Sequence, residues 1–327
     1  MKKTWIWGMA LGTAVILSAC GDDEEATGEG ENGEDAEDSD LTIGISLPSA
    51  THGWMGSLID QAETEANEIS ENEDIDYVMT NAEDPNEQAN DVDDLISQDV
   101  DALVLLPIES AALTPAGQNV ADAGIPLVVV DRELENDAAD IVVTGDNEGI
   151  GYNAGQYLID ELDGEGDVVE ITGPPNSVTE QRGAGFEEAI AGEDGIEVVA
   201  SQDGDFSTET SLDVMQNILQ AQDNIDAVYT QDDGMAFGVL QAIEEAGRED
   251  IQYITGAGGE TEMFDHIQDE DSLITATFLY PPSMSVEGVR LGADLAQGEE
   301  PEETEVVLEA TEITDENADE YYEDASF

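Results

Sequence analysis

Five residues of the sequence have side chains suited to holding a small polar ligand: Trp54, Asp131, Arg132, Arg182 and Phe206. Guanidinium and carboxylate groups make paired, charge-assisted hydrogen bonds with vicinal hydroxyls, and aromatic faces stack on the C–H faces of a sugar ring. A site that combined them would suit a small polyhydroxylated compound. The same residues are equally typical of two core aromatics beside a local ion pair, and their types alone leave both interpretations open.

The scarcity of basic residues makes each arginine informative. The 327 residues include 81 acids and only six bases, for a formal charge of −75. Nucleic acids and anionic membrane surfaces would repel such a chain, so both are excluded as partners. Disorder, the usual consequence of high net charge, is excluded because 40% of the residues are hydrophobic and Val, Ile and Leu runs recur throughout. The chain can bury a core, and its length suggests two domains.

The first 40 residues are typical of export and tethering segments. Lys2 and Lys3 precede a short apolar run, which ends in Leu-Ser-Ala before Cys20, the single cysteine of the sequence. This pattern predicts a signal peptide over residues 1–19, and the run is too short to span a bilayer. Residues 21–40 hold 11 acids and several glycines, which predicts a solvated linker. A lone cysteine also means that the chain has no internal disulfide.

The sequence Leu17-Ser18-Ala19-Cys20 resembles the lipobox of bacterial lipoproteins. The resemblance implies that Cys20 is lipidated and anchors the exported protein to the cell membrane on the extracytoplasmic side, in a periplasm or at a cell surface. After the signal is removed, four arginines remain against all 81 acids. Because molar salt shortens the screening length to about 3 Å, an acidic surface of this kind predicts a halophile's protein that is stabilised by NaCl.

Short β-branched runs alternate with helical periodicity from Leu41 onward. This alternation predicts right-handed βαβ units and mostly parallel sheets that are covered on both faces. A polar interruption at residues 143–151 divides the strands, so two doubly wound lobes are favoured over a (β/α)₈ barrel. Strands are predicted at residues 41–47, 75–79, 102–106, 126–131, 141–144, 168–172, 196–201, 227–230, 251–255 and 274–279, and helices at 58–69, 149–161, 208–221, 234–246 and 284–296.

Ligands of doubly wound sheets bind outside the carboxyl ends of the strands. Two of the four arginines and the aromatics Trp54 and Phe206 fall in segments that follow predicted strands. We therefore expect these side chains to meet at one edge. The segments are 48–55, 131–132, 180–182, 202–206, 231–233, 256–259 and 280–282.

From Leu41 to about Gln297 the chain resembles the ribose-binding-protein family of type I periplasmic binding proteins, the ligand receptors of ABC importers. The resemblance implies Rossmann-like lobes joined by a hinge of three crossovers, near residues 145–147, 279–281 and 307–310. The N-terminal lobe would hold residues 41–145 plus 280–308, and the C-terminal lobe and tail residues 146–279 plus 309–327. The resemblance is carried by Val130-Asp131-Arg132, Gly145-Asp146-Asn147 with Gly149 and Gly151, Glu180-Gln181-Arg182-Gly183 with Gly185-Phe186, Val214-Met215-Gln216-Asn217, and residues 231–238.

The resemblance also implies ligand-binding residues. By position, Trp54 and Met55 match the stacking aromatics of the family and Phe206 its second-lobe aromatic. The hydroxyl-binding groups would be those of Asp131, Arg132, Arg182 and Asp232.

Three further candidate ligand-binding residues, Gly258, Tyr280 and His52, lie where the sequence departs from the family. Gly258 lies in an Ala-Gly-Gly turn where the ribose receptors carry an acid, Tyr280 follows a leucine in place of a glutamine, and His52 replaces a polar residue. His52 is equally typical of a loop cap without ligand contact. We therefore expect a sugar, a polyol or a similar small ligand that need not be ribose.

The sequence thus predicts a monomeric, non-enzymatic substrate-binding lipoprotein that closes on its ligand and delivers it to an ABC permease. A receptor for a sugar-like signal with the same fold is the alternative. No P-loop, HExxH, Ser/His/Asp order or cysteine cluster indicates an enzyme, a cofactor or a metal site. A transcriptional regulator of this fold would carry a helix-turn-helix where the signal peptide and acidic linker stand.

Overall fold

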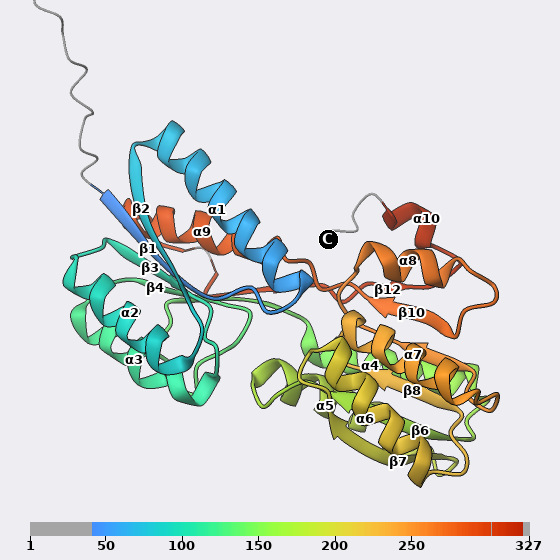
Figure 1. Ribbon diagram of the computed structural model, residues 1–327. Helices are drawn as coiled ribbons and strands as arrows, with labels where there is room; N and C mark the ends of the chain where they lie inside the picture. The colour runs from blue at the N-terminus through green and yellow to red at the C-terminus, as the bar shows by residue number, and fades with distance from the viewer. Residues whose placement is uncertain (1–40, 302, 323–327) are drawn as a thin grey trace, which may run out of the picture. The chain divides into compact units, whose positions relative to one another are not determined.

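Two six-stranded sheets organise the chain in the computed structural model, which describes residues 41–301 and 303–322 (Figure 1). The predicted signal peptide, Cys20 and the acidic linker lie outside the described residues. The two α/β lobes confirm the predicted fold class and exclude the (β/α)₈ barrel.

The first sheet is entirely parallel, with the strand order β11-β5-β4-β3-β1-β2. Helices α1 and α9 pack together over one face, and α2 and α3 over the other (Figure 1). Every residue of β3 and β4 is buried, as expected for central strands of a covered parallel sheet. The bounds are β1 Leu41–Pro48, α1 Gly53–Glu73, β2 Ile75–Ala82, α2 Pro85–Ser97, β3 Ala102–Leu105, α3 Ser110–Ala123, β4 Leu127–Val130, β5 Ile141–Gly145, α9 Met284–Ala296 and β11 Glu305–Leu308.

The second sheet has the order β12-β10-β9-β8-β6-β7 and is parallel except for β12, which runs antiparallel to β10. Helix α4 packs closely on α5, and α6 on α7. The bounds are α4 Asn147–Glu161, β6 Gly166–Thr172, α5 Ser177–Ile190, β7 Ile196–Asp203, α6 Thr208–Ala221, β8 Ala227–Thr230, α7 Asp233–Ala246, β9 Tyr253–Thr255, α8 Thr261–Ile267, β10 Ile274–Phe278, β12 Glu312–Ile313 and α10 Ala318–Tyr321.

The chain passes between the sheets three times: after β5, after β10 and after β11. The strands predicted from residues 41 to 279 are present, with ends that differ by a few residues. The strands β11 and β12 were not predicted, because β11 carries an acid and is only partly buried, and β12 has only two residues. No helix among the described residues is long and apolar enough to cross a membrane.

Close backbone contact between α4 and α5 fixes the start of the second lobe. A Cβ at Gly151 would stand 1.9 Å from the carbonyl oxygen of Arg182, and a Cβ at Gly185 would stand 2.0 Å from that of Glu148. Only glycine allows two helices to approach this closely. The contact places Arg182, on α5, beside the first turn of α4.

We expect Gly151→Ala to destabilise the protein by about 1–3 kcal/mol, because the new methyl group must push α5 away. Gly192→Ala is the matched control, since a Cβ there meets nothing within 4 Å. Urea unfolding followed by circular dichroism measures both. Equal stability of the two variants would contradict the close packing of α4 on α5.

Candidate functional site

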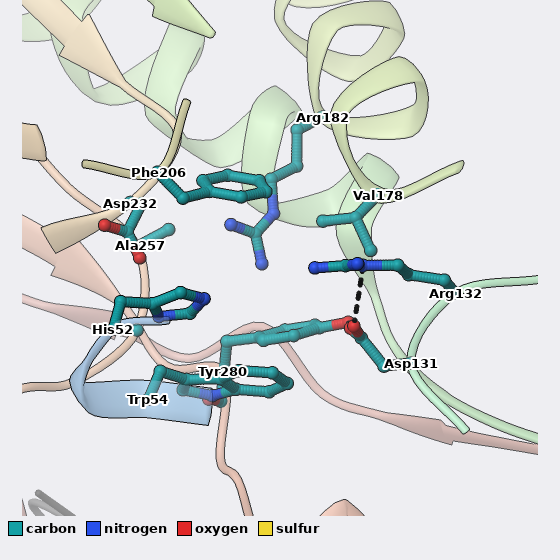
Figure 2. A pocket seen from close by; sticks show the side chains of 11 residues that line it. His52, Trp54, Asp131, Arg132, Val178, Arg182, Phe206, Asp232, Ala257 and Tyr280 are labelled. Atoms are coloured by element: carbon teal, nitrogen blue, oxygen red, sulfur yellow. Dashed lines mark hydrogen bonds and ion pairs between the residues drawn. The ribbon is translucent and has the colours of Figure 1, made fainter. Parts of the chain in front are cut away.

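The predicted site residues, except Met55, line one cavity at the carboxyl ends of the strands (Figure 2). The cavity holds about 350 Å³ of empty space, its open mouth included. Its lining residues are His52, Trp54, Asp131, Arg132, Val178, Arg182, Phe206, Asp232, Ala257, Gly258 and Tyr280.

Met55 is the one predicted site residue that does not line the cavity. The residue is 1% exposed and belongs to a buried hydrophobic cluster with Leu58 and Ile59 of the same helix. Successive residues of a helix point about 100° apart, so Met55 on α1 cannot share the direction of Trp54.

Trp54 is more deeply placed than a simple stacking platform. Its ring is 5% exposed, and its Nε1 donates to the backbone oxygen of Tyr280 at 2.7 Å. The ring centroid lies 5.4 Å from that of Tyr280 and 6.2 Å from that of His52, stacked on both. Trp54 therefore fits both interpretations of the sequence, because it is a core residue and also lines the cavity.

A left-handed turn after β4 presents Asp131 and Arg132. Asp131 has φ 66°, which is uncommon for a residue other than glycine, and its N–H donates to the Val143 carbonyl at 2.8 Å. Arg132 Nη1 donates to the Ile108 carbonyl at 2.6 Å, and its Nε lies 3.4 Å from Asp131 Oδ2. Strained backbone conformations are often retained at functional sites because they orient the side chains there.

Arg182 is almost fully buried, at 3% exposure, and is bound by uncharged groups. Its Nε donates to Asn147 Oδ1 at 2.9 Å, and its Nη1 donates to the Gln231 carbonyl. Its guanidinium carbon lies 4.4 Å from the centroid of the Tyr280 ring, in cation–π contact. The other three arginines each pair with a carboxylate, whereas Arg182 has none within 4 Å among the described residues.

Phe206 forms the opposite wall and also depends on unusual backbone. Asp205 and Phe206 have φ values of 58° and 47°, directly after β7. A Cβ at Gly173 would come within 2.1 Å of Phe206 Cζ, so the ring occupies space that glycine leaves.

The His52 ring lies 6.2 Å from that of Phe206. Burial, with the nearby Arg132 charge, lowers the pKa of His52 to about 4, so this ring is neutral at neutral pH.

Asp232 belongs to a group of three acids at the start of α7 and α8. Its Oδ1 accepts from the Met235 N–H at 3.3 Å and caps α7. Burial and the neighbouring Asp233 charge raise the pKa of Asp232 to about 7, and Arg182 opposes this rise. Burial, with the charges of Asp233 and Asp232, raises the pKa of Glu260 to about 8. Asp232 therefore lines the cavity as a carboxyl that neutral pH only partly ionises.

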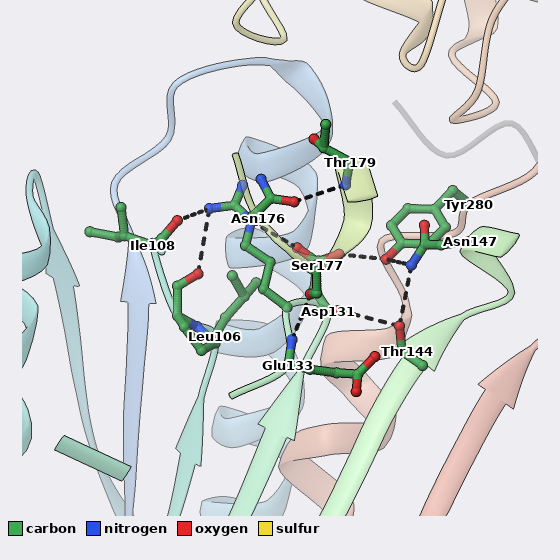
Figure 3. Close-up of polar contacts among 12 residues, drawn as sticks. Leu106, Ile108, Asp131, Glu133, Thr144, Asn147, Asn176, Ser177, Thr179 and Tyr280 are labelled. Carbon is green, nitrogen blue, oxygen red and sulfur yellow. Dashed lines mark hydrogen bonds and ion pairs between the residues drawn. The ribbon is translucent and has the colours of Figure 1, made fainter. Parts of the chain in front are cut away.

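A chain of hydrogen bonds joins the cavity to the first crossing between the sheets (Figure 3). Asn147 Nδ2 lies 3.4 Å from Thr144 Oγ1 and 3.3 Å from Tyr280 Oη. Tyr280 Oη donates to Asp131 Oδ1 at 2.5 Å. Nearby, the Glu133 N–H donates to Ser177 Oγ at 2.9 Å, which links the loop after β4 to α5.

Sequence reasoning missed three residues of this site. Val178 and Ala257 line the cavity with small apolar side chains that carry no chemical signal. Asn147, which is 2% exposed, orients Arg182 from the start of α4. Its place in the Gly-Asp-Asn sequence, beside the polar interruption, was the available signal. The described residues contain no cluster of His, Cys, Asp or Glu that could hold a metal ion.

Comparison with known proteins gives the same picture of the fold. The ribose import binding protein RbsB of Bacillus subtilis is 32% identical over 247 residues, which is 75% of this chain and 78% of that one. A xylitol-binding protein of Mycolicibacterium smegmatis is 29% identical over 268 residues, or 81% of this chain and 76% of that one.

A solved structure shows the same likeness in three dimensions. The periplasmic binding protein of the arabinose ABC transporter of Shewanella sp. ANA-3, bound to L-arabinofuranose, has a TM-score of 0.79 and 27% identity. The match covers 87% of this chain and 95% of that one. The family model of the periplasmic binding protein domain matches residues 43–300, and the chain belongs to that family.

Proposed function

We propose that this protein is the substrate-binding component of an ABC importer, and that it captures a sugar or a similar small polyol and delivers it to a membrane permease. The observation that carries the proposal is the cavity in which two arginines, two carboxyls and three aromatic rings converge, all after strand ends. Proteins similar to this chain are named for ribose, xylitol and arabinose, and they are binding proteins and not enzymes.

Capture by closure of the two lobes fits the distribution of the lining residues. His52, Trp54, Asp131 and Arg132 follow strands of the first sheet, while Arg182, Phe206 and Asp232 follow strands of the second. A ligand favours a closed state only if it binds that state more tightly than the open one. A compound held between Arg132 and Arg182 meets this condition, because it contacts both lobes and only the closed state provides both sets of contacts.

A polyol matches the cavity better than an apolar compound. Guanidinium N–H groups donate to hydroxyl oxygens, and the carboxyls of Asp131 and Asp232 accept from hydroxyl hydrogens. The ring of Phe206 supplies a flat apolar face on one wall of the cavity (Figure 2). His52, neutral at physiological pH, adds one donor or acceptor without charge.

The proposal extends to a monomer held at the outer side of the cell membrane by a lipid on Cys20. The support for the lipid anchor is the sequence of residues 1–40 alone, because the structure does not describe these residues. The excess of 81 acids over six bases supports a protein adapted to high salt.

The ligand can be tested with a calorimetric panel of pentoses, hexoses, pentitols and inositols in molar NaCl. We expect at least one to bind with micromolar affinity or better, and Arg132→Gln to weaken it by at least about tenfold, because a charge-assisted hydrogen bond is lost. Arg290→Gln is the matched control, because Arg290 is 58% exposed and pairs with Glu65 on α1. Unchanged affinity in Arg132→Gln would show that this cavity is not the ligand site.

The response to salt tests the adaptation. Between about 0.1 M and about 1 M NaCl the screening length falls from about 10 Å to about 3 Å, which removes repulsion among surface acids. We expect the melting temperature, followed by circular dichroism without ligand, to rise over this range. KCl should act equally, because screening is not specific to the cation. A flat response would contradict adaptation to high salt.

Lipidation is tested by Cys20→Ser in a bacterial host. The wild-type chain should fractionate with membranes, whereas the variant lacks the thiol that carries the lipid and should be released in soluble form. Immunoblots of membrane and soluble fractions measure the difference. Equal membrane association of both chains would contradict the lipid anchor.

A further inference from the structure

The guanidinium of Arg182 keeps unpaired donors inside the cavity. Its Nε and Nη1 donate to Asn147 Oδ1 and to the Gln231 carbonyl. Its Nη2 has no hydrogen-bond partner among the described residues, and solvent still reaches this atom. Figure 2 shows the group within the cavity, between the rings of Phe206 and Tyr280. Both N–H groups of Nη2 are therefore open to a ligand.

The positive charge of Arg182 is only partly balanced by the protein. No carboxylate among the described residues lies within 4 Å of it. Burial raises the pKa of Asp131, Asp232 and Asp233, and the Arg182 charge opposes this rise only in part. Asp131 is also the carboxylate with which Arg132 pairs. The acids around Arg182 therefore leave part of its charge uncompensated.

Arg132 brings a second guanidinium to the same space from the first lobe. Its Nη1 is held by the Ile108 carbonyl, and its Nε is buried beside Asp131. Its Nη2 has no hydrogen-bond partner among the described residues, and solvent reaches it. In Figure 2 the guanidinium groups of Arg132 and Arg182 point into the same part of the cavity. Like charges repel, so an anion between the two groups favours approach of the lobes.

We propose that the ligand is a sugar acid, a small polyhydroxylated compound with one carboxylate, and that this carboxylate lies between Arg182 and Arg132. The inference rests on the proposed function and deepens it. When the lobes close, Arg182 loses the water at Nη2, and a cation removed from water needs acceptors and an opposite charge in exchange. A carboxylate supplies both, whereas a hydroxyl supplies only an acceptor.

The remaining groups of the cavity fit the rest of such a compound. The carboxyls of Asp131 and Asp232 accept hydrogen bonds from ligand hydroxyls, and they oppose a ligand of higher negative charge. A phosphate ester carries about two negative charges at neutral pH, which exceeds the one guanidinium that lacks a carboxylate partner. A monoanion therefore matches the cavity better than a phosphate.

The test compares acids with neutral compounds of the same carbon chain, by calorimetry on the wild-type protein. Molar NaCl shortens the screening length to about 3 Å, which removes the repulsion between an anion and the acidic surface. We expect the tightest ligand to be an acid that binds at least about tenfold more tightly than its neutral partner, because hydrogen bonds between charged groups are stronger. The pairs are ribonate with ribitol, arabinonate with arabinitol, xylonate with xylitol, glucuronate with glucose and galacturonate with galactose.

Asn147→Asp tests whether Arg182 selects the charge. Asn147 does not line the cavity, and the nearly isosteric change puts a carboxylate oxygen where the amide oxygen stands, 2.9 Å from Arg182 Nε. Arg182 then has a counter-ion, so we expect the advantage of the acid to fall below about threefold. Asn217→Asp is the matched control, because it adds the same charge on the exposed face of α6, and it should keep the wild-type advantage.

Neutral compounds that bind the wild type as tightly as their acids would overturn the inference and leave the proposed function intact. An undiminished acid advantage in Asn147→Asp would overturn it as well, because another group would then select the charge. If Asn147→Asp does not fold, the pairs measured on the wild type decide alone. The proposed function fails in a different way, when no acid and no neutral compound binds.

Discussion

The buried guanidinium of Arg182 is the constraint on which the rest of the site depends. A cation removed from water costs several kcal/mol unless its N–H groups find acceptors. Asn147 Oδ1, the Gln231 carbonyl and the face of Tyr280 provide them, and they come from α4, from the segment after β8 and from the crossing after β10. Three distant parts of the chain must therefore meet at one point. The glycine contacts between α4 and α5 make that meeting possible, because they bring Arg182 to the first turn of α4.

With so few cations in the chain, not every buried acid has an arginine partner. Asp233 is fully buried, and its carboxylate accepts from Thr277 Oγ1 at 2.7 Å and from the N–H groups of Gly259 and Glu260 at 2.6 and 2.9 Å. Neutral donors thus take the place of a counter-ion. The same bonds hold the loop after β9, which carries Ala257 and Gly258 to the cavity. Two other buried acids do have arginine partners, since Arg132 pairs with Asp131 and Arg290 with Glu65.

The alternation of strands and helices was enough to predict two mostly parallel sheets. The rule that ligands bind at the carboxyl ends of strands was enough to predict that Arg132, Arg182 and Phe206 lie close together. The predicted helix began at residue 58, so Met55 was grouped with Trp54 as a loop residue, whereas α1 begins at Gly53 and directs Met55 into the core. Nor could it show that Tyr280 bonds to Asp131, because those residues are 149 positions apart and meet only when the chain returns to the first lobe. In the sequence, small apolar lining residues such as Val178 cannot be distinguished from core residues, and only the structure shows that they line the cavity.

Several cavity residues also hold the fold together. Trp54 and Tyr280 belong to a buried hydrophobic cluster that includes residues of both lobes, and Asp232 caps α7. We expect most substitutions at these positions to destabilise the protein, so that variants are lost before a change in ligand preference can be selected. His52, Arg132 and Phe206 are less deeply buried, so they are where ligand preference can drift among descendants of this protein. We therefore expect ligand preference to evolve most readily through the loops after β1, β4 and β7, where a substitution disturbs the least buried structure.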